Sequence, residues 1–299
     1  MQPAVSVIVP NYNHAPFLRQ RIGSILEQTF QDFELILLDD CSTDGSREIL
    51  ESYCNNPRVS YIEFNTANSG SPFCQWGKGI GMAKGEWVWV AESDDWAEPQ
   101  LLERLITEAD KVSDSVLAFC ATRWVDASGA ELWPTRADGR VKVTPGNTFI
   151  KSRMASCNAI ANVSQCIFRR RAFRQEEIWR YEHMRLCGDW LFYVLLAMQG
   201  SVVEVGELLN NYRQHGSNTS DSAERQGLTF TEGVDVLDYM IEHCGLERSD
   251  YATAWGKLWA RYYKQYDFST EVAKKVWNTM AKRHSEVIPS YLIHRLLQR

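Results

Sequence analysis

The chain has 299 residues, of which 44% are hydrophobic and 23% charged, proportions typical of a globular protein. Its formal net charge of -6 at pH 7 argues against nucleic acid as a partner, and no stretch approaches the roughly 18 consecutive apolar residues that suggest a transmembrane helix. The eight cysteines are scattered without a CxxC pair, which favours reduced thiols in a cytoplasmic protein over a disulfide framework or a zinc site.

Strand and helix signals alternate regularly along the first hundred residues. Apolar runs that predict strands occupy residues 5–9, 33–38, 59–64 and 86–91. Helical signals cover residues 14–28 and 71–84, and further helices are expected to start after residue 44 and at residue 99. Short, continuous apolar strands between helices predict an α/β fold with a mostly parallel sheet that helices cover on both faces.

The pattern becomes less regular after residue 116. Strands are expected at 116–125, 163–168, 201–205 and 208–213, a helix at 189–198, and loops with room for a short hairpin at 126–147. Further on, helical patterns cover residues 228–243, 252–266 and 271–284. The sequence therefore predicts an α/β domain over residues 1–220 and a helical C-terminal extension over residues 221–299.

Charges are unevenly distributed along the chain. Residues 251–299 hold nine Lys or Arg side chains against three acidic ones. Trp255, Trp259, Tyr262 and Tyr263 lie among them, a composition that suits peripheral contact with an anionic lipid surface. The same aromatic rings suit packing of the extension onto the α/β domain. Both interpretations stay open. The protein is expected in the cytoplasm, and the first interpretation would place it at the inner face of the membrane.

Acidic side chains follow two of the predicted strands. Asp39 and Asp40 follow the second strand, and Glu92, Asp94 and Asp95 follow the fourth. Ligands of open α/β sheets bind outside the carboxyl ends of the strands, where these acids are expected. Three clustered carboxylates repel one another unless water or a cation neutralises them, and Mg²⁺ prefers such carboxylates together with substrate phosphates. The alternative is an acidic cap for the next helix.

Asp40 and Tyr12 could together recognise a nucleobase. A carboxylate at a strand end can accept a hydrogen bond from the imide N–H of uracil or thymine, and Tyr12 follows the first strand, where its ring could stack on the base. The alternatives are structural: the segment after Asp40 is a good turn and helix start, and an aromatic side chain in a turn is common.

Several short motifs occur in a fixed order, and together they resemble the family 2 inverting glycosyltransferases of the GT-A fold, of the type that makes bacterial cell-envelope polysaccharides. The resemblance is dense over residues 4–100 and sparser to about residue 220. Its motifs are VSVIVPNYN at 5–13, SILEQTF at 24–30, FELILLDD at 33–40, STDG at 42–45, NSG at 68–70, AKGE at 83–86 and ESDD at 92–95.

The resemblance implies a role for each matching residue. It implies that Tyr12 and Asp40 hold the nucleobase, with three neighbours close by: Pro10, Asn11 and Asp39. Within the ESDD motif it implies that Asp95 is the metal ligand and that Asp94 contacts ribose or sugar. Glu92 stands where many relatives have Asp. Lys78 lies in the stretch where many relatives have an Arg-Asn pair, and the resemblance implies that it contacts a phosphate.

Later matches imply the remaining parts of the site. Asp189 matches the catalytic acid of the family, although Gly188 replaces the Glu that usually precedes it. An inverting transfer is a single displacement, so one carboxylate must take the proton of the attacking hydroxyl. The alternative is that Asp189 only caps the following helix, but the two roles are compatible and both are expected. His215 is implied as a second metal ligand or a diphosphate donor, with Arg213 as a counter-charge for the phosphates, and an imidazole ligand favours Mn²⁺ slightly over Mg²⁺.

The expected function is transfer of a sugar from a nucleoside-diphosphate sugar to a hydroxyl of a glycan or lipid-linked glycan in cell-surface polysaccharide synthesis. Two alternatives remain. A sugar nucleotidyltransferase would usually have a Gly-rich loop and a basic residue after the first strand, where this chain has Pro-Asn-Tyr-Asn. A catalytically inactive relative that binds sugar nucleotides or glycans is favoured only by the Gly188 departure.

Overall fold

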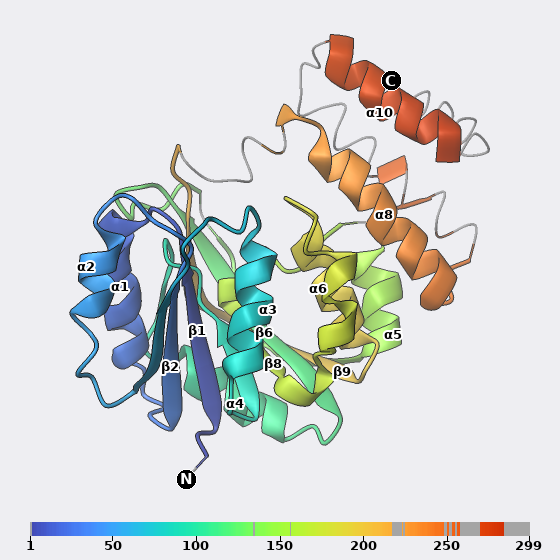
Figure 1. Cartoon of the computed structure of the whole chain (residues 1–299). Coiled ribbons are helices and arrows are strands. Elements are labelled where there is room, and N and C mark those ends of the chain that lie inside the picture. Colours follow the sequence, from blue (N-terminus) through green and yellow to red (C-terminus); the bar gives the residue numbers. More distant parts are fainter. Residues whose placement is uncertain are drawn as a thin grey trace.

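A computed structural model describes residues 2–133, 135–155, 157–216, 223, 225–247, 250, 253, 254, 256, 257 and 270–283. Within them, one mixed sheet forms the centre of the molecule (Figure 1). Its strands are β1 (Val5–Asn11), β2 (Phe33–Asp39), β3 (Val59–Phe64), β4 (Trp87–Val90), β5 (Trp96–Ala97), β6 (Ser115–Val125), β7 (Val141–Pro145), β8 (Cys166–Arg169) and β9 (Ser201–Arg213).

The strand order is β3-β2-β1-β4-β8-β6-β9-β5, and β7 pairs with the other part of β9. The pairings β3-β2-β1-β4 are parallel, as is the pairing of β6 with β9. β8 runs antiparallel to both of its neighbours, and β5 and β7 run antiparallel to β9. The predicted α/β class with a mostly parallel sheet is confirmed.

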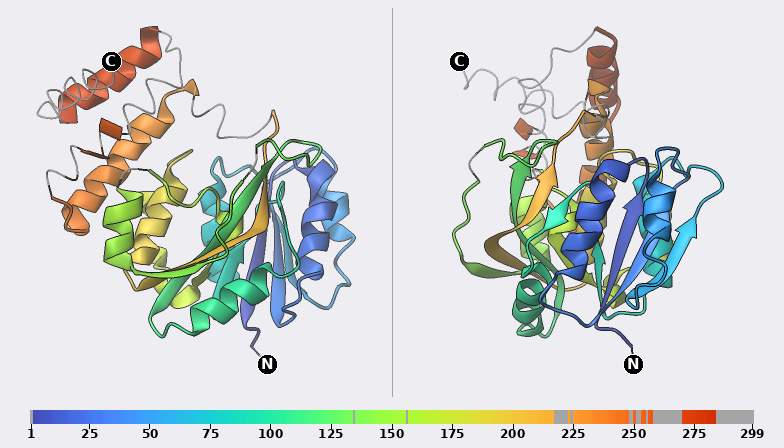
Figure 2. Two further views of the ribbon diagram at one scale, coloured as in Figure 1. Left: turned by 180° about the vertical axis from the view of Figure 1, so that it is seen from behind. Right: turned by 90° about the vertical axis from the view of Figure 1, so that its left-hand side faces the viewer.

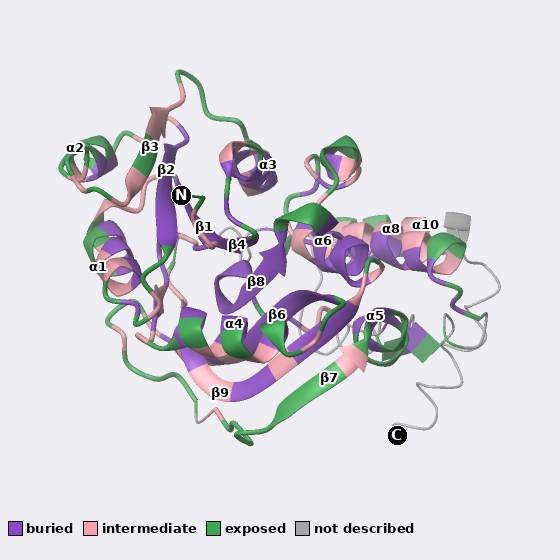
Figure 3. Cartoon of the chain, turned by 90° about the horizontal axis from the view of Figure 1, so that it is seen from below, coloured by how far each residue is buried: buried purple, intermediate pink, exposed green. Residues whose placement is uncertain are grey.

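Helices cover both faces of this sheet. They are α1 (Ala15–Leu26), α2 (Ser46–Glu51), α3 (Pro72–Met82), α4 (Leu101–Asp110), α5 (Gly146–Phe149), α6 (Gly188–Ala197), α8 (Leu228–His243) and α10 (Thr270–Arg283). Alternate residues of a strand point to opposite faces, so Ile8 of β1 joins the core beneath α3 and α6, whereas Val7 and Val9 join the core beneath α1 and α4. Figure 3 shows β2, β6 and β8 largely buried between these helices, whereas β3 and β7 are largely intermediate or exposed.

Three details differ from the sequence expectations. The predicted strands at 201–205 and 208–213 form one strand, β9, because β6 pairs with both halves and a register irregularity between Cys120 and Ala121 accommodates residues 206 and 207. The stretch expected to be mainly loop contains β7, which pairs with the first half of β9. The predicted strand at 163–168 opens with a 3-10 turn, Val163–Gln165, before β8 begins.

The C-terminal part contributes two described helices, which stand beside the α6 side of the sheet domain (Figures 1 and 2). α8 and α10 match two of the three helices predicted there, whereas most of the third, together with Trp255, Trp259, Tyr262 and Tyr263, lies outside the described residues. Phe230, Val234 and Leu237 of α8 belong to the same apolar core as α6. None of the described helices has the length and apolarity to cross a membrane. The domain boundary at residue 220 stays a prediction.

Candidate active site

The carboxyl ends of β1, β2 and β4 lie side by side in the sheet. Asn11 at the end of β1 pairs with Asp39 at the end of β2, and Ile8 of β1 pairs with Val90 at the end of β4. Parallel neighbours end at a common edge, which is where open α/β sheets bind ligands. Three predicted site segments therefore leave the sheet at this edge: residues 10–12, 39–40 and 92–95.

Asp39 holds the turn after β2 in place. Its Oδ1 accepts a hydrogen bond from Asn11 Nδ2 (2.7 Å), and its Oδ2 accepts one from the backbone N–H of Ser42 (2.9 Å). Asn11, Asp39 and Pro10 are buried, whereas 48% of Tyr12 is exposed. An exposed ring beside a hydrogen-bonded turn is an arrangement that can stack on a base, and the base-binding role of these residues stays a prediction.

Asp40 organises the loop between β3 and α3. Its carboxylate accepts hydrogen bonds from Asn65 Nδ2 (2.7 Å), from the backbone N–H and hydroxyl of Ser69 (2.8–3.0 Å) and from Gln75 Nε2 (2.9 Å). The side chain is buried. Asp40 thus joins the end of β2 to α3. The N–H of a bound base would donate one more hydrogen bond to a carboxylate that already accepts several.

The two predicted phosphate contacts already have partners within the protein. Lys78 Nζ forms an ion pair with Glu63 (2.6 Å) near the end of β3. Arg213 is buried, its Nε donates to the backbone oxygen of Asp94 (2.7 Å), and its Nη2 donates to Gln20 (2.6 Å). The guanidinium of Arg213 therefore supports the loop after β4. The contacts of Lys78 and Arg213 with phosphate stay predictions.

Asp94 and Asp95 are both buried but have different surroundings. Asp95 Oδ1 accepts a hydrogen bond from the backbone N–H of Arg213 (2.9 Å), and Oδ2 accepts one from Asn162 Nδ2 (2.5 Å). Asp94 Oδ2 instead lies 3.0 Å from Nε2 of His215. Asp95 thus ties the loop after β4 to β9 and to the segment before β8, while Asp94 is the acid that meets a histidine.

Electrostatics separates the three acids of this loop. Burial raises the pKa of Glu92 to about 8, and the charge of Asp94 adds to the rise. Burial, together with the charge of Asp94, also raises the pKa of Asp95. Burial acts in the same direction on Asp94, but the hydrogen bond from His215 and the charges of His14 and His215 outweigh it, so the pKa of Asp94 is lowered. Negative charge is therefore favoured at Asp94.

A buried arginine balances this acidic loop from α1. Arg21 is completely buried, and its guanidinium carbon lies 4.8 Å from the centre of the Trp89 ring. Burial lowers the pKa of Arg21 to about 10, while the charges of Asp95 and Asp94 oppose that change. The guanidinium therefore stays cationic at neutral pH and offsets part of the acidic charge.

His14, Asp94 and His215 form a group that can hold a metal ion. One potential ligand atom from each residue lies within 4.8 Å of the other two. His14 Nδ1 is hydrogen-bonded to Ser93 Oγ (2.8 Å). Burial lowers the pKa of His14, which favours the neutral imidazole that a metal requires. The residues therefore fit a divalent cation, with Asp94 as the carboxylate of the group. The role of Asp95 as a metal ligand stays a prediction.

Asp189 lies in the first turn of α6. Its Oδ2 accepts a hydrogen bond from Asn158 Nδ2 (2.9 Å), and its Oδ1 accepts one from the backbone N–H of Trp190 (2.6 Å). Burial raises the pKa of Asp189 to about 7, and the charge of Glu232 adds to the rise. A pKa close to neutrality suits a general base. Because α6 begins at Gly188 with Cys187 as its N-cap residue, Asp189 is not the N-cap.

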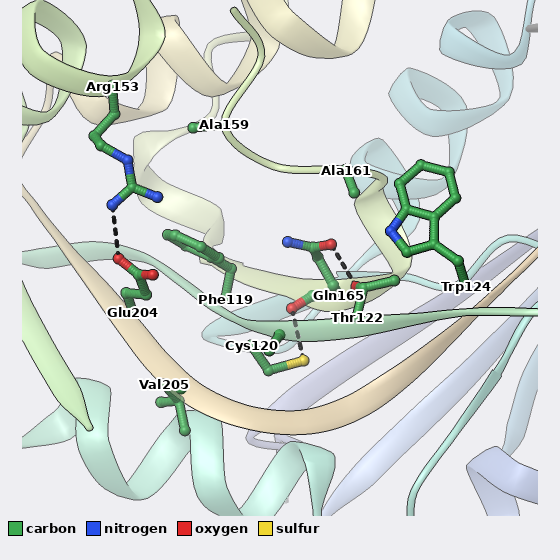
Figure 4. A pocket seen from close by; sticks show the side chains of 12 residues that line it. Phe119, Cys120, Thr122, Trp124, Arg153, Ala159, Ala161, Gln165, Glu204 and Val205 are labelled. Carbon is green, nitrogen blue, oxygen red and sulfur yellow. Dashed lines mark hydrogen bonds and ion pairs between the residues drawn. The ribbon is translucent and has the colours of Figure 1, made fainter. Parts of the chain in front are cut away.

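A cavity of about 210 Å³ lies against β6 and β9 (Figure 4). The ring of Trp124 and the amide of Gln165 line it, and Gln165 Oε1 accepts a hydrogen bond from Thr122 (2.5 Å). Arg153 and Glu204, which form a 3.0 Å ion pair, also line it. An aromatic ring with a few polar groups is the lining expected of a small-molecule site.

The segment 158–162 connects this cavity to both acidic centres. Its alanines, Ala159 and Ala161, line the cavity. Asn158 donates a hydrogen bond to Asp189, and Asn162 donates one to Asp95. A ligand in the cavity would therefore lie beside the segment that contacts the candidate base.

Comparison with known proteins identifies the family. The model of the family described as "Glycosyl transferase family 2" matches residues 6–176. This chain belongs to glycosyl transferase family 2. Chondroitin synthase of Escherichia coli is 28% identical over 256 residues, which make up 84% of this chain and 34% of that protein. The poly(ribitol-phosphate) beta-N-acetylglucosaminyltransferase TarS of Staphylococcus aureus is 34% identical over 116 residues, 38% of this chain and 20% of that protein.

The likeness in fold covers nearly the whole chain. A crystal structure of S. aureus TarS residues 1–349 in complex with UDP-GlcNAc has a TM-score of 0.68 with this family 2 chain at 20% identity, covering 97% of this chain and 79% of that one. This likeness supports the predicted GT-A fold. The chain spans about a third of the E. coli relative and a fifth of the full-length TarS enzyme.

The glycine that replaces the usual acid in this family 2 chain has a local packing reason. A Cβ atom added at Gly188 would collide with the ring of Phe73, a buried side chain of α3. Gly188 therefore lets α3 pack directly against the start of α6. The departure from the family pattern therefore accompanies close packing of α3 against the residue that precedes Asp189.

The structure brings some predicted site residues together and adds others. Asp94 and His215 meet, and residues 10–12 and 39–40 share their edge of the sheet. The sequence interpretation missed His14, whose one signal is its position just past the first strand, at the same sheet edge. It also missed Asn158, which contacts Asp189, because a lone asparagine in a loop has no periodic pattern.

Proposed function

We propose that this family 2 chain transfers a sugar from a nucleoside-diphosphate sugar to a hydroxyl of a glycan acceptor, with inversion at the anomeric carbon. The observation that carries the proposal is the convergence of His14, Asp94 and His215 at the carboxyl edge of the sheet. The name of the E. coli relative, chondroitin synthase, supports a polysaccharide product, and we place this chain in cell-surface polysaccharide synthesis.

A UDP-sugar is the proposed donor, because TarS, which shares the fold, was crystallised with UDP-GlcNAc. Tyr12 and Asp40 would hold the base, with Pro10, Asn11 and Asp39 shaping the turn beside it. Asp94, His14 and His215 would hold Mn²⁺ or Mg²⁺, and two imidazoles beside one carboxylate favour Mn²⁺. A bound divalent cation would neutralise the diphosphate and stabilise the charge that develops on it as it leaves.

Asp189 is the proposed base. Its carboxylate would take the proton of the acceptor hydroxyl while that oxygen attacks the anomeric carbon from the side opposite the diphosphate. One displacement of this kind inverts the anomeric configuration. The hydrogen bond from Asn158 to Oδ2 orients the carboxylate, and a pKa of about 7 leaves a substantial ionised fraction at neutral pH.

The proposed acceptor site is the cavity on β6 and β9. Its volume of about 210 Å³ equals the space of on the order of seven waters at roughly 30 Å³ each, which suits one sugar ring better than an extended chain. The Trp124 ring can pack on the apolar face of a sugar, while Gln165 can bond to its hydroxyls. A glycan or lipid-linked glycan would present its terminal residue here.

A donor screen tests the function. The protein is incubated with Mn²⁺ and a panel of UDP-, GDP- and dTDP-sugars, and thermal stabilisation and nucleotide release are measured with and without oligosaccharide acceptors. Metal-dependent stabilisation by one nucleotide class, with release of its diphosphate, is expected. Stabilisation without release or transfer would indicate an inactive binding relative. Pyrophosphate release from a nucleoside triphosphate and a sugar phosphate would indicate a nucleotidyltransferase instead.

We propose that the chain acts on the cytoplasmic side, with the basic residues 251–299 as a candidate contact to the inner face of the membrane. Co-sedimentation with vesicles containing anionic lipid, compared between the full chain and a chain truncated at residue 250, tests this contact. Equal binding by the two proteins would exclude the membrane role of this tail.

A further inference from the structure

Glu232 of α8 binds the backbone just before the candidate base. Its carboxylate accepts hydrogen bonds from three successive N–H groups, those of Arg185 (3.0 Å), Leu186 (2.9 Å) and Cys187 (2.9 Å). Asp189 follows two residues after the last of these. Hydrogen bonds to a charged acceptor are stronger than neutral ones, so this single side chain ties α8 to the backbone that leads into α6.

The helix that carries Glu232 is anchored to the same region. Phe230, Val234 and Leu237 of α8 are buried in one apolar core with Trp190 and other residues of α6. The thiol of Cys187 also contacts the backbone oxygen of Thr229 (3.8 Å). The acidic side chain is thus presented by a packed helix and not by a loop, which gives its hydrogen bonds a defined direction.

A second element borders the other end of this segment. The ring of Phe73 in α3 occupies the space that a side chain at Gly188 would need. The turn leading to Asp189 is therefore held by α8 through polar contacts and bordered by α3 through apolar packing. Its position depends on two helices that lie far apart in the sequence.

We propose that Glu232 is a positioning residue for the transfer reaction: the C-terminal helix α8 holds the turn that delivers Asp189, so the helical extension is part of the catalytic apparatus. This inference rests on the proposed function of Asp189. It predicts that loss of Glu232 reduces turnover without weakening donor binding, because the donor residues lie on β1, β2 and the loop after β4.

The charge of Glu232 adds a second measurable effect. Among the described residues, the ionisable groups that act on Asp189 or respond to its charge include Glu232 of α8, Cys166 of β8 and Tyr193 of α6. Glu232 raises the pKa of Asp189 through its negative charge. Removing that charge should move the acidic limb of the turnover profile to lower pH, whereas a merely structural role would leave the limb where it is.

The experiment compares Glu232→Gln and Glu232→Ala with Glu242→Gln, an exposed acid on the same helix, in the full-length protein. Turnover and KM for the donor identified by the screen are measured from pH 5 to 9, with UDP and Mn²⁺ as the binding probe. Amide hydrogen exchange of residues 185–187 reports on the turn independently of any substrate. We expect kcat to fall about 10-fold in Glu232→Gln and about 100-fold in Glu232→Ala.

The accompanying results should be unchanged donor KM and UDP binding, a shift of the acidic limb to lower pH, and faster amide exchange at residues 185–187, with Glu242→Gln like the native protein. A lower melting temperature with unchanged turnover per folded molecule and an unchanged pH profile would overturn the inference. Native-like exchange in Glu232→Ala would also overturn it, even if no donor were found. Absence of transfer by the native protein with all donors would count against the proposed function, separately from the exchange result.

Discussion

His215 Nε2 lies 3.0 Å from Asp94 Oδ2 and joins two segments that are 121 residues apart in the sequence. This contact brings the end of β9 onto the loop after β4, and His14 completes the group from the start of α1. Asp95, one residue away, instead accepts hydrogen bonds within the protein, among them those from Asn162 and from the backbone N–H of Arg213. The two aspartates are therefore expected to respond differently to substitution.

Asp94→Asn should lose metal binding while keeping the fold. The substitution removes the carboxylate that the two imidazoles face, so Mn²⁺ affinity should fall by about 100-fold or more, beyond the roughly 10–100-fold effect of outer partners of a metal site. A titration of Mn²⁺ in the presence of UDP, followed by melting temperature, measures this. His14→Ala should also lower the Mn²⁺ affinity measured in this titration. Native-like Mn²⁺ affinity in both variants would exclude the site.

Asp95→Asn should act mainly on stability. The substitution exchanges a buried acceptor for an amide whose N–H₂ group would face the Asn162 amide or the Arg213 N–H, and a buried group left without its partner costs about 1–3 kcal/mol. The metal-free protein should therefore melt at a lower temperature. If this variant instead kept its melting temperature and lost Mn²⁺ binding, Asp95 would be the ligand, as the family pattern implies.

Asp189→Asn should abolish transfer. Without a proton acceptor, turnover should fall by about 100- to 10,000-fold, the contribution typical of general base catalysis. UDP binding should stay within a factor of about two, since the donor residues lie elsewhere. Asp32→Asn, a change of the same kind at an exposed position, is the matched control. Full turnover in Asp189→Asn would refute the assignment of the base.

Transfer should depend on pH through the ionisation of Asp189. An aspartate with its ordinary pKa would be ionised throughout the range from pH 5 to 9, but burial raises the pKa of Asp189 to about 7. Only the ionised form accepts a proton, so kcat should rise as the pH increases from 6 to 8, with a midpoint near 7. A profile without a rise in this range would show that another group limits the reaction.

Gly188→Ala should destabilise the protein through Phe73. The added Cβ atom collides with the Phe73 ring, and such overpacking typically costs about 1–3 kcal/mol. Combining it with Phe73→Leu should recover part of the loss, as measured by denaturant unfolding. Gly81→Ala is the control, because an added Cβ atom there meets nothing within 4 Å, and an alanine in α3 should stabilise the helix by about 1 kcal/mol.

Trp124→Ala should affect the acceptor and not the donor. The ring lines the cavity on β6 and β9 and packs against Tyr212, with ring centres 4.7 Å apart. Its removal should raise the acceptor KM by about 10-fold, a loss of roughly 1.4 kcal/mol, and leave UDP binding unchanged. An unchanged acceptor KM would place the acceptor elsewhere.

Much of the fold follows from local pattern. β-branched runs such as that at residues 5–9 alternate with segments whose apolar residues recur at helical spacing. These two periodicities identify strands and helices because each depends on neighbours in the chain. The places where prediction differed are non-local. β9 is one strand because β6 pairs with both of its halves. β7 forms because residues 141–145 pair with the first half of β9, on the edge opposite β6.

The sequence by itself determined the class of fold, the family and the edge of the sheet at which the site lies, since acids directly after buried strands must emerge there. Only the tertiary structure decided that Asp94 and not Asp95 meets His215, that His14 joins them, and that Glu232 reaches the turn before Asp189. These relationships depend on the approach of segments far apart in the chain and on burial that shifts pKa values, and neither leaves a periodic signal in the sequence.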